Sequence, residues 1–499
     1  MIYPSCRIFF AAKAKFTSNF PRSTKSLANF LQRSNRARKR MSVNNKISHK
    51  AKPASIVLTN IAAMVLLMEL PKLVNYGMGV IFCYIIAALL FLLPATMATL
   101  QLCRIYANGH PTSVFCWVGQ ALGWRWGLLA QFLQWTYAAL RLPSVLLFGV
   151  IAVAYAASWI EPMKWVCENK MSVIIIVLII YWAAVLISMR GLETVTKAIK
   201  ISAIVGLVVP TILLAGLVVV YFTTSVELIP ERAALTNYEL VTVSLQSVIF
   251  FMGIEFSSTL SPATKGYRKS LLPSGLIVLL IFCIVSFALA GVLAVDTVAS
   301  PSALFTGFYT YLGYAHIPML MPLVSIAVVG GVFAVVLSWS NAPSLGIYQA
   351  AKRGYLPPFL QKCNKRGVHT NVLLVQAGVV TFTCILFVIV PSVHFLFSLI
   401  VALAIGLYLM MYLLIFASSV ATNRTTLSWV IALTGGGTTM GALVWSLRAV
   451  DGVSPLMWYL FVVIALVVLT VAPLVIYSLR KPSWRNHLSN LSMWRDGSW

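Results

Sequence analysis

Two of the eleven acidic residues in this sequence, Glu69 and Glu255, lie deep inside long apolar stretches. Each stands beside a residue that interrupts helices, since Pro71 follows Glu69 and Gly253 precedes Glu255. A carboxylate in hydrocarbon costs roughly 3 kcal/mol on membrane-insertion scales, so an acid in such a stretch is by default a functional group. The combination predicts a polar pathway through a membrane.

The helix breakers strengthen this prediction because an unwound turn leaves backbone N–H and C=O groups unpaired at membrane depth. Such groups are tolerated only where they line a cavity, where they can bind the ends of a polar substrate. Two broken helices at corresponding positions of two five-helix halves predict an inverted repeat. The alternative is a proline kink in the first stretch and a close-packing glycine in the second.

The composition is that of a polytopic membrane protein. The chain has 499 residues, of which 60% are hydrophobic and 10% charged, and its mean hydropathy is +0.90. The eight cysteines and six histidines show no paired spacing, so we expect no disulfide framework, no metal site and no cofactor. The net charge of +26 could suggest nucleic acid. However, the basic residues gather in the first 52 residues and in short connections, which favours a lipid bilayer as the partner.

Residues 1–52 form a basic extension without acidic residues, which we expect to be disordered. Met41 is a second candidate start of translation, and with this start residues 1–40 would not be part of the protein. A transit peptide or a basic tail on anionic lipid are the alternatives.

Apolar windows long enough to cross a bilayer recur twelve times, which predicts an all-α protein with twelve transmembrane helices. They occupy one domain, 53–481, followed by a short tail, 482–499. The windows lie near 55–76, 79–103, 126–158, 171–189, 198–222, 241–260, 271–295, 318–349, 371–391, 394–418, 427–448 and 455–479.

Charge alternates between successive connections. Most Lys and Arg after residue 53 fall in one alternate set of connections, and most acids fall near the other. The positive-inside rule then places both termini in the cytoplasm of a multi-pass protein of the cell membrane.

Several motifs resemble the amino acid–polyamine–organocation permeases, and most closely the glutamate:GABA antiporter branch. The most specific runs from Trp339 through a Gly-x-Tyr to a Leu-Pro-Pro. The resemblance covers about residues 53 to 481 and implies a five-plus-five inverted repeat with two further helices. Its motifs lie at 68–71, 109–127, 252–255, 338–358 and 364–368.

The resemblance also implies roles for single residues. Glu255 matches an acid that contributes to gating and proton-linked transitions, and Trp339 matches an aromatic residue that lies against the bound amino acid. Lys200 is similar to a lysine that replaces a sodium ion between helices 1 and 8, although it could equally be a positive-inside charge. Backbone groups at the two breaks would hold the substrate's α-carboxylate and α-amino groups; they belong to Met68, Glu69, Leu70, Gly253 and Ile254.

The sequence departs from the branch at two expected selectors of the substrate side chain. Val335 stands where the branch has a glutamate, and Met68 where it has a tyrosine. In return, Arg141 lies inside the third span, where a buried arginine should be paired. It could clamp a carboxylate of the substrate, of Glu69 or of Glu255, or it could snorkel to the outer interface. Lys72, three residues after Glu69, could form a local ion pair with it.

The leading hypothesis is an amino acid transporter, and not an enzyme, that works by alternating access as an antiporter, with proton coupling as an option. Tyr408 and Tyr412 of the tenth span, at i and i+4, could face the site together, or they could pack against a neighbouring helix. The alternatives are a proton-coupled amino acid symporter and, in a different class, a membrane-embedded lipid-modifying enzyme that uses one of the buried acids as a base. The sequence leaves the substrate, and the choice between monomer and homodimer, open.

Overall fold

The structure is a computed structural model that describes residues 53–106, 112–157, 169–224, 235–260, 265–298, 300–389, 393–449 and 453–486. All of them belong to one compact unit, Ala51–Trp499. The predicted basic extension 1–52, residues 109–111 of one motif and most of the tail lie outside the described residues.

The described part of the chain contains helices and no strand. In chain order the elements are α2 (Pro53–Met64), η1 (Leu70–Tyr76), α3 (Gly79–Ala87), η2 (Ala88–Leu92), α4 (Leu93–Tyr106), α5 (Val114–Ala121), α6 (Trp124–Ala156), α8 (Lys170–Ser188), α9 (Leu192–Ala203), η3 (Ile204–Val208), α10 (Val209–Thr224), α11 (Asn237–Phe250), α12 (Phe256–Leu260), α13 (Lys265–Val292), α14 (Val295–Val298), α15 (Ala303–Tyr314), η4 (Pro318–Leu320), α16 (Met321–Lys352), η5 (Pro358–Gln361), α17 (Thr370–Ile389), α18 (Val393–Thr422), α19 (Thr426–Ser446), α20 (Pro455–Ser478) and α21 (Ser483–Asn486).

Ten helices among the described residues are long and apolar enough to cross a membrane, so the chain is a multi-pass membrane protein. Each corresponds to one of the predicted windows. They are Gly79–Tyr106, Trp124–Ala156, Lys170–Ser188, Leu192–Thr223, Lys269–Val292, Pro318–Lys352, Thr370–Phe387, Phe395–Thr422, Thr426–Ser446 and Pro455–Ser478.

The other two predicted windows, 55–76 and 241–260, are not continuous helices. In the first, α2 ends at Met64, and η1 begins only at Leu70 with Pro71 in its first turn. Proline has no N–H, so Pro71 cannot donate the backbone hydrogen bond that would continue α2 through this segment, and it is found in the first turn of η1, where no such donor is needed.

In the second window, α11 ends at Phe250 and α12 begins at Phe256. Gly253, in the turn between them, has φ +121°. Side chains other than glycine's rarely adopt this backbone conformation, so the glycine permits the bend. The interruptions predicted beside Glu69 and Glu255 are therefore both present.

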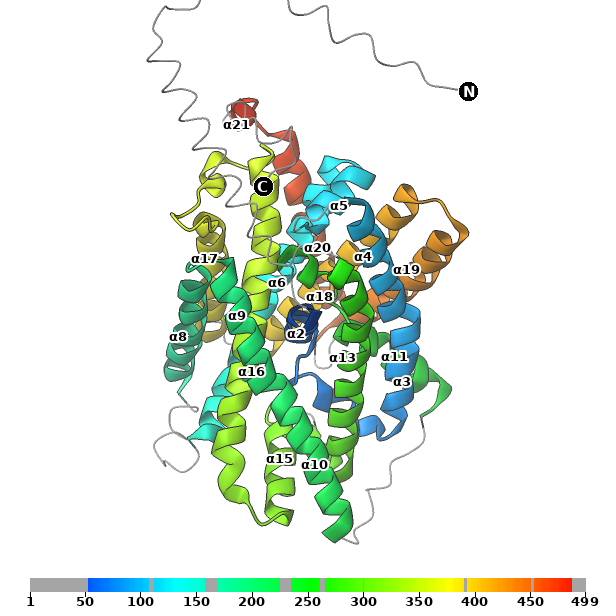
Figure 1. The fold of residues 1–499 in the computed structure, drawn as a ribbon, viewed down its shortest axis with the longest axis vertical. Helices are drawn as coiled ribbons and strands as arrows, with labels where there is room; N and C mark the ends of the chain where they lie inside the picture. The colour runs from blue at the N-terminus through cyan, green and yellow to red at the C-terminus, as the bar shows by residue number, and fades with distance from the viewer. Residues whose placement is uncertain are drawn as a thin grey trace, which may run out of the picture. The chain divides into compact units, whose positions relative to one another are not determined.

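The short helix α2 is buried among the longer ones. It packs against α9, α13 and α16, and Figure 1 shows it surrounded by these helices. The long helices α6 and α16 pack along each other, and α18 packs against α6. A broken, mostly buried segment is thus enclosed by continuous helices, which is where unpaired backbone groups can be satisfied.

Two short helices, α5 and α15, were not predicted. At 1.5 Å per residue the 12 residues of α15 span only about 18 Å, too short to cross a bilayer. Both elements are shorter than the windows of about 20 apolar residues that predict a membrane-spanning helix.

Candidate functional site

The two helix breaks meet. A Cβ atom built on Gly253 would lie 3.1 Å from the carbonyl oxygen of Ala63, near the end of α2. The indole Nε1 of Trp339, on α16, donates to the same oxygen at 3.0 Å. The end of α2, the bend before α12 and the predicted aromatic residue of α16 therefore share one place in the bundle.

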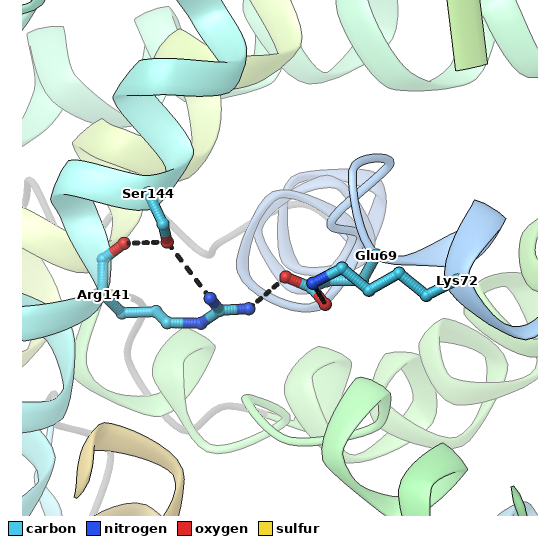
Figure 2. A network of polar contacts seen from close by, with 4 residues as sticks. All are labelled: Glu69, Lys72, Arg141 and Ser144. Atoms are coloured by element: carbon cyan, nitrogen blue, oxygen red, sulfur yellow. Dashed lines mark hydrogen bonds and ion pairs between the residues drawn. The ribbon is translucent and has the colours of Figure 1, made fainter. Parts of the chain in front are cut away.

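Glu69 lies beside this place and is held between two cations. Arg141, on α6, donates through Nη2 to Oε1 of Glu69, and Lys72 Nζ lies 2.8 Å from Oε2 (Figure 2). The other terminal nitrogen of Arg141 donates to Ser144 Oγ at 3.1 Å. Arg141 was predicted to clamp a carboxylate of the substrate, of Glu69 or of Glu255, and in the structure it is paired with Glu69.

The burial of these three side chains differs. The side chain of Arg141 is 3% exposed and that of Glu69 is 9% exposed, whereas that of Lys72 is 43% exposed. The burial of Arg141 contradicts the snorkelling alternative, because a snorkelling head group would lie in solvent. Glu69 is shared by a buried cation and a partly solvated one, so this cluster carries one net positive charge when all three groups are ionised.

Glu255 forms a second, fully buried centre. Its Oε1 accepts hydrogen bonds from Gln134 Nε2, at 2.9 Å, and from the Tyr408 hydroxyl, while its Oε2 accepts from the Tyr412 hydroxyl. Tyr412 in turn accepts a bond from the backbone N–H of Gly253 at 2.8 Å. The carboxylate is thus tied directly to the broken part of the chain.

Stacked aromatic rings lie between the two acidic centres. Tyr137 stacks on Tyr408 with ring centroids 3.9 Å apart and an interplanar angle of 9°. The same ring lies 5.1 Å from that of Trp339. Tyr137 is one helical turn from Arg141 on α6, so one helix face contacts both centres.

Residues 54–487 match the amino acid permease family. The chain belongs to this family. An uncharacterized transporter of Legionella pneumophila is 25% identical to this permease over 381 residues, which cover 73% of this chain and 79% of the relative. Glutamate/gamma-aminobutyrate antiporters of two Lactococcus lactis strains are each 26% identical. One alignment covers 71% of this chain and 72% of the relative, the other 64% and 65%.

These relatives confirm the predicted resemblance and point to a transporter rather than a membrane-embedded enzyme. Among the described residues of the permease, no group of three or more His, Cys, Asp or Glu side chains could hold a metal ion. The side chains at the two centres can recognise charge, form hydrogen bonds and bind protons.

Two small cavities flank the unwound segment of the permease, each of about 10 Å³. One is lined by Glu69, Leu70 and Arg141 among others, and the second, apolar cavity by Met68 and Val335 among others. The predicted side-chain selectors Met68 and Val335 thus share a cavity. About 10 Å³ is room for roughly one water molecule, so neither cavity has room for an amino acid in this conformation.

Two site residues of the permease, Gln134 and Tyr137, were missed. With Gln131 and Arg141 they recur at spacings of three and four residues, which places all four on one face of α6. Gln131 donates to Gln134 at 2.9 Å, so the polar face continues beyond Glu255. A polar stripe along an otherwise apolar helix was the signal that could have found them.

Lys200 lies on α9, which packs against both α2 and α16. Its side chain is half-buried, and its ammonium group makes no hydrogen bond or ion pair with any other residue that the structure describes. The predicted role of Lys200 in place of a sodium ion stays a prediction.

Proposed function

We propose that this permease exchanges amino acids across the cell membrane by alternating access, with both termini in the cytoplasm. Family membership and the antiporter relatives support amino acid transport. The observation that carries the proposal is the meeting of the two helix breaks at Ala63 and Gly253, between two buried acids.

In this proposal α2 with η1, and α11 with α12, are two interrupted crossings. Added to the ten continuous helices, they give twelve spans arranged as a five-plus-five inverted repeat with α19 and α20 appended. The two interrupted crossings would then be the first and the sixth, the corresponding members of the two halves, which is the arrangement expected of such transporters.

Two side chains form hydrogen bonds with backbone groups that a bound substrate would use. The Tyr412 hydroxyl accepts from Gly253 N–H, where a substrate carboxylate would accept. The Trp339 indole donates to Ala63 C=O, where a substrate ammonium group would donate. Substrate binding would replace these two bonds and widen the two small cavities.

Arg141 supplies the selectivity for charge. A substrate carboxylate that takes Arg141 from Glu69 leaves Glu69 paired with Lys72, so no buried charge loses all its partners. Removal of the only partner of a buried ion costs about 3–5 kcal/mol, which this exchange of partners avoids. We therefore infer that acidic amino acids are the preferred substrates.

Glu255 supplies the coupling to protons. When it is ionised, its negative charge balances the net positive charge of Glu69, Lys72 and Arg141. An anionic substrate then gives the two centres together one net negative charge, and protonation of Glu255 removes it. Binding of an acidic amino acid is thus linked to uptake of a proton by the site.

The test is counterflow in proteoliposomes with radiolabelled acidic, neutral and basic amino acids at acidic and neutral pH. We expect uptake of labelled acidic amino acids only when an amino acid is present inside, and faster uptake at the lower pH. Uptake driven by an imposed proton gradient into vesicles without internal amino acid would identify the symporter instead. No exchange of any amino acid at either pH would refute the proposal.

Two variants separate the proposed roles. Glu255→Gln should exchange at a rate that no longer depends on pH, while Glu193→Gln, an exposed acid paired with Lys197 on α9, serves as the control that keeps the dependence. Arg141→Ala should lose affinity for acidic amino acids more than for neutral ones. Unchanged pH dependence in the first variant, or unchanged affinity in the second, would remove that residue from its role.

A further inference from the structure

A second polar cavity lies far along the chain from the two acids, where α6 begins and α20 ends. It is open to the surface, has a volume of about 580 Å³ and is lined by Arg125, Leu474, Tyr477, Ser478 and Arg480. Among the described residues, the lining therefore contains two guanidinium groups and two hydroxyl groups and no acid. Nothing in the transport proposal uses it.

The two arginines face aromatic rings rather than acids. The guanidinium carbon of Arg480 lies 3.9 Å from the ring centroid of Tyr477, and that of Arg125 lies 5.0 Å from the ring centroid of Trp126. Neither arginine forms an ion pair with an acid in the described ranges. Stacking on a ring fixes a guanidinium plane but leaves its edge N–H groups available for an anion.

A column of stacked rings holds this end of α20 in place. Trp124 stacks on Tyr355 with centroids 6.1 Å apart, and Tyr355 stacks on Tyr477 with centroids 5.4 Å apart. Arg480 lies over both Tyr477 and Tyr355. The cavity wall is therefore fixed by packing across three elements, so an anion would meet arginines that are already oriented.

The position of the cavity identifies the source of the anion. The surface of α20 leading to the cavity is apolar and exposed, with Leu460, Val467, Val471 and Val475 each at least two-fifths exposed. In a membrane-spanning helix such a surface faces lipid chains. The cavity lies at the C-terminal end of that surface, next to Leu474, where we expect the head groups of the surrounding lipids.

We propose that this cavity binds the phosphate group of an anionic phospholipid, held by Arg125 and Arg480 with its acyl chains along α20. Arginine forms paired hydrogen bonds to phosphate oxygens, and the Ser478 and Tyr477 hydroxyls can donate to the same group. Two arginines offer two positive charges to a lipid with one negative charge, so an anionic head group is preferred to a zwitterionic one. Free phosphate has the same chemistry and is distinguished by the experiment.

The experiment compares wild type, the double variant Arg125→Gln/Arg480→Gln and the control Lys362→Gln/Arg424→Gln. The control removes the same charge from two exposed residues outside the cavity. Each protein is placed in nanodiscs of phosphatidylcholine, alone or mixed with phosphatidylglycerol, and bound lipid is counted by native mass spectrometry after release into detergent. In detergent without lipid, inorganic phosphate is titrated against thermal unfolding.

Wild type and the control should retain phosphatidylglycerol, and the cavity variant should bind it at least about tenfold more weakly. Stabilisation of wild type by inorganic phosphate, lost in the cavity variant but without preferential retention of phosphatidylglycerol, would overturn the lipid proposal and assign the site to the soluble anion. Equal retention of phosphatidylglycerol in all three proteins, with no difference in their response to phosphate, would overturn the proposal. Equal unfolding temperatures in phosphatidylcholine alone establish that the variants are folded.

Discussion

The buried ion pair of Glu69 and Arg141 predicts a specific order of stabilities among single variants. Arg141→Gln leaves Glu69 with Lys72, a cation that is 43% exposed and therefore partly screened. Glu69→Gln leaves Arg141, only 3% exposed, with Ser144 as the neutral partner in Figure 2. Lys72→Gln removes only the exposed cation. Glu69→Gln strands a buried charge, Arg141→Gln leaves a buried charge with one partly screened partner, and Lys72→Gln strands no buried charge.

The magnitudes follow from these exposures. Removal of one partner of a buried pair costs about 3–5 kcal/mol. We expect Glu69→Gln near the upper end, because Arg141 keeps no charged partner, and a loss below this range for Arg141→Gln, because Glu69 keeps Lys72. For Lys72→Gln we expect a loss of about 0–1 kcal/mol, as for an exposed salt bridge. The double variant Glu69→Gln/Arg141→Gln strands no charge at this pair and should be more stable than the sum of the single losses implies.

The assay is equilibrium unfolding in mixed micelles, with the free energy of unfolding measured for wild type, the three single variants and the double variant. The double-mutant cycle gives the coupling energy between Glu69 and Arg141 without assumptions about either residue alone. Lys72→Gln serves as the control, because it removes a charge from the same cluster at the exposed position.

Two results would refute the reasoning. Additivity of Glu69→Gln and Arg141→Gln to within about 0.5 kcal/mol would mean that the two side chains do not interact in the folded protein. A loss from Lys72→Gln as large as that from Arg141→Gln would mean that burial does not decide which cation holds Glu69.

Three further predictions concern other parts of the fold. Tyr412→Phe removes the hydroxyl that bridges Glu255 and Gly253. It should reduce transport more than Tyr408→Phe does, because without the Tyr408 hydroxyl Oε1 of Glu255 still accepts a hydrogen bond from Gln134. Equal transport rates in the two variants would contradict this prediction. Gly253→Ala should destabilise the protein by about 1–3 kcal/mol because of its positive φ, measured by unfolding temperature. Burial lowers the pKa of His369 from 6.5 to about 4, so between pH 6.5 and pH 4 only the unfolded chain binds a proton at this residue. The free energy of unfolding should therefore fall by up to about 3 kcal/mol as the pH drops from 6.5 to 4. His369→Gln should abolish this pH dependence.

The control for Gly253→Ala is Gly437→Ala, since a Cβ at Gly437, within α19, would meet no atom within 4 Å. Alanine is the better helix former, so this change should leave the unfolding temperature unchanged or slightly raised. An equal loss in both variants would show that the strained backbone of Gly253 is not the cause.

The sequence could predict the apolar helices and both helix breaks because each depends on local chemistry. Twenty apolar residues in a row have few alternatives to crossing a bilayer, and Pro71 and Gly253 limit the backbone wherever they occur. The short helices α5 and α15 could not be found in the same way. They are too short to cross a bilayer and lie against the longer helices, so no window of spanning length marks them.

The site was only partly predictable because its contacts join distant segments. Burial marked Glu69, Glu255 and Arg141 as groups that need partners, but the choice of Glu69 for Arg141 depends on how α6 packs beside the unwound segment. Similarly, the spacing of Tyr408 and Tyr412 showed that they share a face of α18. Only the packing of α18 shows that this face meets Glu255.

In the proposed mechanism the two acidic centres act together, because charges that share a region of low dielectric influence each other strongly. The cluster of Glu69, Lys72 and Arg141 has one positive charge in excess, and Glu255 is the buried acid that offsets it across the stacked rings of Tyr137 and Tyr408. A proton on Glu255 leaves that positive charge without its counterpart, and an incoming carboxylate restores the balance at Arg141. The same arrangement disfavours a cationic substrate, which would add a second uncompensated positive charge whenever Glu255 is protonated. We therefore expect the selectivity for substrate charge and the pH dependence of transport to change together. A variant that alters one of them without the other would show that the two centres act independently.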